Sequence, residues 1–219
     1  MQQEAADGRP QQTGLTRETR ALAKADPVLK TIIERVGPVE LPEAREPFAG
    51  LARAIFYQQL AGSAAAAIMR KFLAFYPEGA FPSPEAVLAT QDQDLRSAGL
   101  SRQKVSYLKD LAAKFQDGTL EDVKLRTLPE DELAAVLMSV KGIGRWTADM
   151  FLIFTLHRLD VLPVGDLGIR KGAQLAYGLP EMPAPKALLE MGERWRPYRS
   201  VAALYLWRSM AVSPLATGK

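Results

Sequence analysis

Hydrophobic residues recur at intervals of three and four along most of the chain, and the alternation typical of strands is nearly absent. This spacing places apolar side chains on one face of a helix. Asp26-Pro27 before one apolar run and Gly37-Pro38 after it are typical start and stop signals. We therefore predict an all-α fold. The predicted helices span 15–24, 27–36, 48–60, 63–75, 84–90, 102–116, 130–138, 144–156, 167–177, 185–193 and 198–211.

A hairpin between two helices is the central feature of this pattern, within the stretch from Leu137 to Gly172. Gly142-Ile143-Gly144 interrupts two apolar helical segments, and glycine tolerates the positive φ that such a turn needs. The first amides of the second helix have no partners within that helix and lie at the positive end of its dipole. The turn is therefore predicted to bind an anion such as phosphate. We expect Ile143 to be buried and to hold the turn against the core.

A loop that ends in a carboxylate follows the hairpin. Pro163 and Gly165 break the helical period, and Asp166 opens the next helix. Taken alone, Asp166 is most simply an N-cap, because aspartate is among the preferred residues there. Asp149 and Asp160, the other carboxylates of this stretch, are expected to be structural.

Composition narrows the class of protein. A chain of 219 residues, 47% of them hydrophobic, is long enough for one or two domains with a substantial core. The sequence has no cysteine, which excludes disulfides, thiolate metal sites and cysteine-ligated iron–sulfur clusters. A single histidine, His157, cannot build a metal site and is interpreted as a helix residue. No apolar run approaches the length of a membrane span, so we expect a protein of the cytoplasm, nucleoid or nucleus.

The charge balance is mild, with 28 Lys and Arg against 25 Asp and Glu. A net charge of +3 permits nucleic-acid binding without requiring it, because a basic patch on one face is what counts. Clusters at 102–104, at Lys141 with Arg145, and at 170–171 could form such a patch. The alternative for each of them is an ordinary solvated surface.

Four ordered blocks of the sequence resemble one known family. GIGRWTAD followed by DVLPVGDLGIRKG resembles the helix-hairpin-helix, Gly/Pro-rich loop and aspartate of the DNA glycosylase superfamily that includes endonuclease III. Within it, the 3-methyladenine DNA glycosylase II family is the most similar. The resemblance extends through AIFYQQLAGSAAAA (54–67), GLSRQKVSYLKDLA (99–112) and ERWRPYRSVAALYLWR (193–208).

The resemblance implies a fold of two helical subdomains with a cleft at the hairpin. The terminal segments, 14–46 and 167–219, would form one subdomain. Residues 47–166 would form the central subdomain, with the helix-hairpin-helix at 130–158. Residues 1–13 are polar and contain glycine and proline, so we expect them to be disordered.

The resemblance also assigns the chemistry to Asp166. Excision of a damaged base breaks an N-glycosidic bond through an oxocarbenium-like transition state, which a nearby carboxylate stabilises while it orients or deprotonates water. Superfamily members that also cleave the DNA strand carry a lysine two residues after the GxG, where its amine attacks the sugar. Trp146 occupies that position here, so we expect a monofunctional glycosylase.

Aromatic residues are candidates for a base pocket, because alkylation at N3 or N7 gives a purine a positive charge that favours aromatic faces. The candidates are Trp146, Tyr198, Tyr57 and Phe56. The alternative for any of them is core packing, which is the usual place of aromatic residues on helices. For Trp195, Tyr205 and Trp207 we expect core packing.

A flipped nucleotide leaves a gap in the duplex, and apolar wedges can fill it. Leu60 is the candidate wedge, with Gln59 beside it, although Leu60 could equally cap the core. By resemblance, the contacts to the DNA backbone come from Lys141, Gly142, Gly144, Arg145, Trp146 and Thr147. The carbonyls of Met138, Val140 and Ile143 could hold a monovalent Na⁺ or K⁺ ion. Lys141 stands where the family commonly has proline, which predicts a less rigid turn.

The expected function is removal of 3-methyladenine and related alkylated purines from double-stranded DNA, by a monomer that requires no cofactor. One alternative is a helix-hairpin-helix protein that only binds DNA. Another is a glycosylase for neutral lesions, such as ethenoadducts or deaminated bases. The aspartate at the end of the loop argues against the pure binding protein, whereas the lesion range depends on the shape of the pocket.

Overall fold

A computed structural model describes residues 16–211, and every regular element within them is a helix. The predicted all-α class is therefore confirmed. Within the described residues the chain forms two compact units, one from 16–41 with 168–211 and the other from Pro42–Leu167. The sequence places these boundaries at 46/47 and 166/167. The segment 1–13, expected to be disordered, lies outside the described residues.

The terminal unit contains α1 (Thr16–Ala25), α2 (Pro27–Val36), α11 (Leu167–Ala176), α12 (Pro185–Gly192), the 3-10 helix η2 (Glu193–Trp195) and α13 (Arg199–Ala211). The central unit contains α3 (Pro47–Tyr57), α4 (Gly62–Leu73), the 3-10 helix η1 (Pro77–Gly79), α5 (Pro84–Ala89), α6 (Asp92–Ser97), α7 (Arg102–Gln116), α8 (Asp122–Thr127), α9 (Glu130–Met138) and α10 (Arg145–Phe154). No helix within the described residues is long and apolar enough to span a bilayer.

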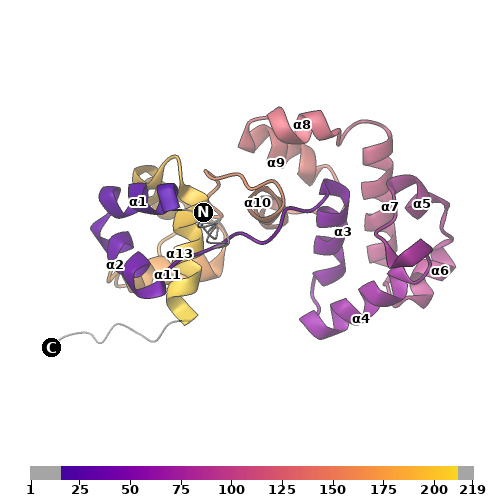
Figure 1. Ribbon diagram of the computed structural model, residues 1–219, viewed down its shortest axis with the longest axis horizontal. Coiled ribbons are helices and arrows are strands. Elements are labelled where there is room, and N and C mark those ends of the chain that lie inside the picture. Colours follow the sequence, from indigo (N-terminus) through magenta and orange to yellow (C-terminus); the bar gives the residue numbers. More distant parts are fainter. Residues whose placement is uncertain (1–15, 212–219) are drawn as a thin grey trace, which may run out of the picture. The chain divides into compact units, whose positions relative to one another are not determined.

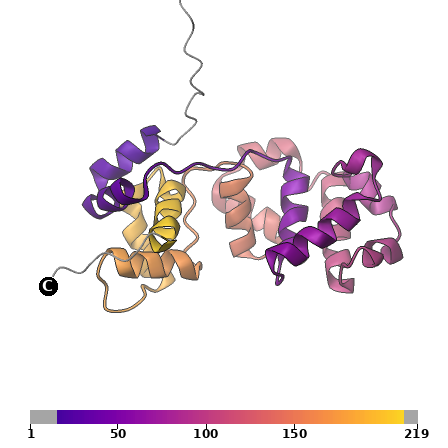
Figure 2. The ribbon, with the colours of Figure 1, turned by 60° about the horizontal axis from the view of Figure 1, so that its bottom comes forward.

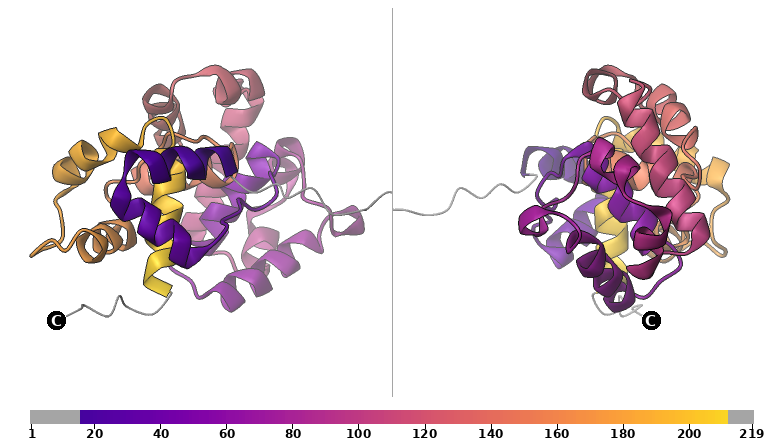
Figure 3. Two further views of the ribbon diagram at one scale, coloured as in Figure 1. Left: turned by 60° about the vertical axis from the view of Figure 1, so that its left-hand side comes forward. Right: turned by 90° about the vertical axis from the view of Figure 1, so that its right-hand side faces the viewer.

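In the terminal unit, helices from the two ends of the chain pack together. The yellow helix α13 runs beside the indigo pair α1 and α2 in Figure 2 and in the left panel of Figure 3. Trp195 and Tyr205 are almost completely buried there, so the prediction that they are core residues is confirmed. Because α13 packs on α1 and α2, and the Tyr205 hydroxyl donates to the Gly37 carbonyl at 3.2 Å, both segments contribute to this core.

A buried carboxylate links the two segments of the terminal unit. Asp26 caps α2, as predicted, and its Oδ1 accepts the amides of Val28 and Leu29 at 2.9 and 3.2 Å. Its Oδ2 accepts the Tyr177 hydroxyl at 2.6 Å and the Trp195 indole N–H at 3.0 Å. Burial opposes ionisation of Asp26, but these hydrogen bonds outweigh it and hold the pKa of the carboxyl below its ordinary value.

In the central unit, α7 is the helix on which the neighbours pack (Figure 1). Both α3 and α5 lie against it, and the core is rich in edge-to-face and tilted aromatic pairs. Phe56 is fully buried and its ring centroid lies 5.0 Å from that of Phe72. Two lysines of α7 hold the ends of these neighbours, since Lys104 donates to carbonyls at the end of α3 and Lys109 to those at the end of α5.

Some helix boundaries differ from the prediction. The sequence pattern does not predict α6 and α8, because each has only six residues and too few apolar positions to show a period. The helix predicted over 48–60 ends at Tyr57. His157, expected within a helix, instead follows α10 with φ 52°, and its Nε2 lies 3.0 Å from the Pro42 carbonyl oxygen.

Candidate functional site

The hairpin between α9 and α10 is a tight turn of defined type. The Ile143 amide donates to the Val140 carbonyl at 3.1 Å, and Gly142 has φ +81°. A positive φ at the third position only, after a second residue of ordinary φ, is the type II pattern. Ile143 is buried, as predicted, and holds the turn against the core. Lys141 therefore occupies the second position of a type II turn.

Gly142 is required for two reasons. Its φ lies in the left-handed region, which side chains with a Cβ rarely adopt. A Cβ at this position would also lie 2.2 Å from the ring of Tyr107 on α7. The turn is thus seated directly on an aromatic ring of its neighbour.

Backbone amides at the start of α10 are free to bind an anion. Gly144 is the N-cap of α10, and its carbonyl accepts the Ala148 amide at 3.0 Å. The amides of Gly142, Gly144 and Trp146 donate to no acceptor within the described residues. Together with the positive end of the helix dipole, they form the kind of site that binds a phosphate group.

Trp146 and Asp166 are direct neighbours. Trp146 lies in the first turn of α10, and Asp166 directly precedes α11. The indole Nε1–H of Trp146 donates to Oδ2 of Asp166 at 2.7 Å. Trp146 is 54% exposed, so it is not a core residue and its aromatic surface is open to a ligand. The structure thus joins the predicted reactive carboxylate to the predicted pocket residue.

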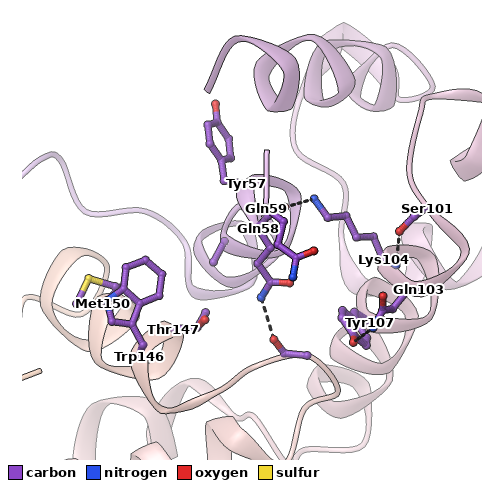
Figure 4. Close-up of a pocket in the computed structure, with 12 residues that line it drawn as sticks. Tyr57, Gln58, Gln59, Ser101, Gln103, Lys104, Tyr107, Trp146, Thr147 and Met150 are labelled. Carbon is purple, nitrogen blue, oxygen red and sulfur yellow. Dashed lines mark hydrogen bonds between the residues drawn. The ribbon is translucent and has the colours of Figure 1, made fainter. Parts of the chain in front are cut away.

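A cavity of about 570 Å³ in the central unit is lined in part by Trp146 (Figure 4). Asp166 is not among its lining residues and is joined to it through Trp146. The cavity is lined from four elements: the end of α3, the start of α7, the hairpin and the first turns of α10. The lining residues are Ala54, Tyr57, Gln58, Gln59, Ser101, Gln103, Lys104, Tyr107, Gly142, Trp146, Thr147 and Met150. Figure 4 shows Trp146 and Met150 together on one wall and Lys104 reaching across from α7.

The four residues predicted for the base pocket occupy different places in the structure. Trp146 and Tyr57 line the cavity. The Arg53 guanidinium lies 4.6 Å from the centroid of the Tyr57 ring and donates to the Tyr57 hydroxyl at 2.9 Å. Phe56 does not line the cavity, and this prediction is wrong: its side chain points into the core against Phe72. Tyr198 belongs to the terminal unit, and its role in the pocket stays a prediction.

The predicted wedge segment is a loop, because α3 ends three residues earlier than expected. Gln58 leaves the helix, and its Nε2 donates to the Gly142 carbonyl of the hairpin at 2.8 Å (Figure 4). Gln59 adopts a left-handed conformation with φ 54°, which costs about 1 kcal/mol or more for a residue that is not glycine. Leu60 is 39% exposed and so does not cap the core. Strain and an exposed apolar side chain in one loop are typical of a contact surface.

The basic residues of the hairpin are paired with carboxylates. The Lys141 Nζ lies 3.7 Å from Asp110, and Arg145 contacts Asp149 at 2.9 Å and Asp131 at 3.1 Å. Asp149 is buried, which raises the pKa of its carboxyl despite the opposing effect of Arg145, so its expected structural role is confirmed. Thr147 is also buried, so its side chain offers little surface to DNA. The amides, more than these side-chain charges, carry the anion-binding potential of the hairpin.

Three residues on α7 were not predicted to belong to the site: Lys104, Tyr107 and Asp110. Each contacts the backbone either of the loop Gln58–Leu60, called the wedge loop below, or of the hairpin. In the sequence, Lys104 belongs to the basic cluster at 102–104 and all three residues lie in the block 99–112 that carries the resemblance, but neither signal connects them to the loop or to the hairpin. Among the described residues, no cluster of three or more His, Cys, Asp or Glu side chains could hold a metal ion.

Comparison with known proteins identifies relatives over most of the chain. A family model described as HhH-GPD superfamily base excision DNA repair protein matches residues 52–197. DNA-3-methyladenine glycosylase 1 of Schizosaccharomyces pombe is 36% identical over 201 residues, which are 90% of this chain and 88% of that protein.

Two solved structures have the same fold. A Schizosaccharomyces pombe 3-methyladenine DNA glycosylase in complex with abasic DNA has a TM-score of 0.77 and 34% identity, and the match covers 93% of this chain and 99% of that one. A DNA-3-methyladenine glycosidase from Bacillus halodurans has a TM-score of 0.81 and 37% identity, with 88% of each chain covered. The likeness extends over both units of the described structure.

Proposed function

Because the chain belongs to the HhH-GPD superfamily of base excision DNA repair proteins, we propose that it is a monofunctional DNA glycosylase for alkylated bases. Its substrates would be 3-methyladenine and related N3- and N7-alkylated purines in double-stranded DNA. Relatives with the name DNA-3-methyladenine glycosylase that match nearly the whole chain support this assignment. The observation that carries it is the hydrogen bond that Trp146, a residue of the cavity wall, donates to Asp166.

Asp166 would act on the sugar side of the scissile bond. As the base departs, positive charge develops on the sugar ring, and the carboxylate stabilises it and orients or deprotonates the attacking water. The Trp146 N–H donates to Oδ2 of this carboxylate and so fixes its orientation. The reaction consumes one water and leaves an abasic site and the free base.

The exposed indole face of Trp146 would recognise the base. A purine alkylated at N3 or N7 carries a positive charge that is attracted to the negative face of an aromatic ring. The same charge weakens the glycosidic bond, so the base can leave without protonation by a general acid. Tyr198 could add a second aromatic face, as predicted from the sequence.

The enzyme would not cleave the DNA strand. A strand-cleaving glycosylase attacks the sugar with an amine, and an indole cannot form a Schiff base. One amine does line the cavity, that of Lys104, but it donates to the carbonyls of Phe56 and Gln58 at 2.7 and 2.8 Å. We therefore expect no covalent adduct to be trapped by borohydride.

The hairpin amides would grip the phosphate backbone, and Leu60 with Gln59 would enter the gap left by the flipped nucleotide. A monomer suffices for these contacts. A monovalent cation on the carbonyls of Met138, Val140 and Ile143 stays part of this proposal. The Val140 carbonyl already accepts the Ile143 amide and retains one lone pair for such an ion.

Base release from methylated duplex DNA tests the proposal. The wild type should release 3-methyladenine and leave alkali-labile sites without nicks. Asp166→Asn should lose about a hundredfold or more in rate, on the scale of a key electrostatic group, and still bind DNA. Asp94→Asn is the matched control, since it removes the same charge from an exposed position on α6 and should keep the wild-type rate.

Two results would contradict this function. If the wild type binds duplex DNA with the usual salt dependence but releases no base, the chain is a binding protein. If ethenoadenine or hypoxanthine is released faster than 3-methyladenine, the lesion class is neutral, and the role given to base charge is wrong.

A further inference from the structure

A row of polar residues on α7 contacts both segments that the proposed function assigns to DNA. Lys104, Tyr107 and Asp110 follow one another at intervals of three, which makes neighbours of successive side chains on a helix. Lys104 reaches the wedge loop, Gln58–Leu60, and the other two reach the hairpin turn, Val140–Gly144. The row therefore touches two chain segments that are at least 80 residues apart.

Lys104 holds the start of the wedge loop. Its Nζ donates to the Phe56 carbonyl at 2.7 Å and to the Gln58 carbonyl at 2.8 Å. These carbonyls lie at the C-terminal end of α3, where the helix dipole favours a positive charge. Because the bonds go to the backbone on both sides of Tyr57, they tie the last turn of α3 to the first residue of the loop.

Asp110 holds the hairpin turn. Its Oδ2 accepts the Lys141 amide at 2.9 Å, and its Oδ1 lies 3.7 Å from the Lys141 Nζ. Lys141 is the second residue of the type II turn. The hydrogen bond of the turn itself is donated by the Ile143 amide, so the Lys141 amide has no acceptor within the turn. The carboxylate satisfies this extra donor and so restrains a turn that has no rigid proline at its second position.

A third contact joins the two segments to each other. The Gln58 side chain of the wedge loop donates to the Gly142 carbonyl at 2.8 Å. On its other side Gly142 sits against the Tyr107 ring, whose hydroxyl accepts a hydrogen bond from Gln103 of the same helix. Loop, turn and α7 thus form a closed set of contacts around the cavity.

We propose that α7 is the positioning element of the DNA interface, with Asp110 fixing the phosphate-binding turn and Lys104 fixing the wedge loop. The proposal rests on the function given above for these two segments. Neither residue needs to touch the reacting atoms: each acts through backbone that does touch DNA. Asp110 takes over the restraint that a proline at position 141 would otherwise supply.

A proline rescue tests the role of Asp110. Asp110→Ala leaves the Lys141 amide without its acceptor, and the dissociation constant for a duplex with an abasic-site analogue should rise about tenfold, on the scale of one charge-assisted hydrogen bond. Lys141→Pro removes that amide and suits the second position of a type II turn. The double variant should therefore recover most of the lost affinity. If Asp110 instead stabilised another part of the protein, Lys141→Pro would not restore the affinity.

Several results would overturn this half of the proposal. One is wild-type affinity in folded Asp110→Ala, judged by its thermal unfolding. Another is a double variant that binds no better than Asp110→Ala. If Asp110→Ala does not fold, the double variant decides: folding and binding support the proposal, and failure to fold assigns Asp110 to general stability.

A matched pair of lysines tests the role of Lys104. Lys109 lies on the same helix and makes the same kind of contact, to the Leu88 and Thr90 carbonyls at 2.7 and 2.6 Å, at the end of α5. Lys104→Met should reduce single-turnover base release about tenfold, on the scale of losing one hydrogen bond to a charged group, and weaken the fluorescence change of a flipped reporter base. Lys109→Met should lower stability to a similar degree and release base at the wild-type rate.

Equal effects of the two lysine variants on base release would refute the positioning role of Lys104. Failure of the proposed function would look different. In that case the wild type releases no base, yet the binding measurements on Asp110→Ala and its double variant still show whether α7 positions the hairpin.

Discussion

The indole N–H of Trp146 lies 2.7 Å from Oδ2 of Asp166 and donates a hydrogen bond to it. Twenty residues separate the two in sequence, and the loop that contains Pro163 and Gly165 returns the chain to the first turn of α10. In the proposed function, the same side chain would present an aromatic face to the base and orient the carboxylate. Recognition of the lesion and stabilisation of the transition state would then be linked through one residue.

Trp146→Phe separates these two roles, because phenylalanine keeps an aromatic face and loses the N–H donor. We expect the single-turnover rate of base release to fall about tenfold, since Asp166 loses one charge-assisted partner, while DNA affinity stays close to that of the wild type. Trp146→Ala should lose considerably more, because it also loses the aromatic face. Equal rates for Trp146→Phe and the wild type would show that the hydrogen bond does not contribute to catalysis.

Gly142→Ala and Gly144→Ala should fail in different ways. A Cβ at residue 142 meets the Tyr107 ring at 2.2 Å in a backbone of φ +81°, so this variant should lose about 2 kcal/mol or more of stability together with DNA affinity. A Cβ at residue 144 meets no atom within 4 Å, and its φ is −93°. Gly144→Ala should therefore keep its unfolding temperature and lose only DNA affinity, because the Cβ blocks the approach of a phosphate. Urea titrations and binding isotherms of both variants check this contrast.

Much of the hairpin could be predicted from the sequence, because its determinants are local. The Gly-Ile-Gly turn, buried Ile143 and the position of Asp166 at a helix start all follow from neighbouring residues. The end of α3 could not be predicted, since Gln58 leaves the helix for a carbonyl 84 residues away. Phe56 and Tyr57 are adjacent and both aromatic, and periodicity did not show that one faces the core and the other the cavity.

The charged partners of basic residues are equally hard to predict from the sequence. Lys141 and Arg145 look in the sequence like phosphate contacts, because both are basic and flank the turn. Their carboxylate partners come from α7, α9 and α10, and Asp110 is 31 residues distant. The pair Arg145–Asp149 lies within α10 at the i,i+4 spacing that a sequence can show. The contacts with Asp110 and Asp131 join different helices and cannot be read from a one-dimensional pattern, so the sequence overstates the role of side-chain charge at the hairpin.

Asp26 should be one of the most sensitive positions for stability. It is almost completely buried and accepts four hydrogen bonds, two from the α2 backbone and two from Tyr177 and Trp195. Asp26→Ala leaves these donors without an acceptor and should cost about 3 kcal/mol or more. Thr31→Ala, on the exposed side of the same helix, is the control and should cost less than about 1 kcal/mol. Chemical denaturation compares them, and similar losses in the two would contradict this account.

Acid should weaken the same network. The pKa of Asp26 is held below its ordinary value of 3.8, because hydrogen bonds to the carboxylate outweigh the cost of its burial. A group whose pKa is lower in the folded state contributes stability above its unfolded pKa, and this stability is lost as the pH falls through the folded pKa. The unfolding free energy of the wild type should therefore fall more steeply below about pH 4 than that of Asp26→Asn. Parallel curves for the two proteins would show that Asp26 does not carry this pH dependence.

Arg145→Ala should reveal a structural residue rather than a phosphate contact. Its guanidinium is bound to Asp149 at 2.9 Å and Asp131 at 3.1 Å, and Asp149 is buried. Removal of Arg145 leaves that carboxylate without its cation, and burial already raises the pKa of Asp149. A raised pKa makes ionisation costly in the folded state, so the loss of stability should grow as the pH rises through the acid range.

DNA binding by Arg145→Ala provides the complementary measurement. Each phosphate neutralised by a side chain contributes about 0.9 to the slope of log K against log salt concentration. Because the charge of Arg145 is already matched by two carboxylates, the slope for Arg145→Ala should stay within about 0.5 of the wild-type value. The opposite result would be a slope that decreases by about 0.9, the value for one phosphate contact, in a variant whose stability is unchanged. It would show that Arg145 contacts a DNA phosphate and that its pairing with Asp149 does not stabilise the fold.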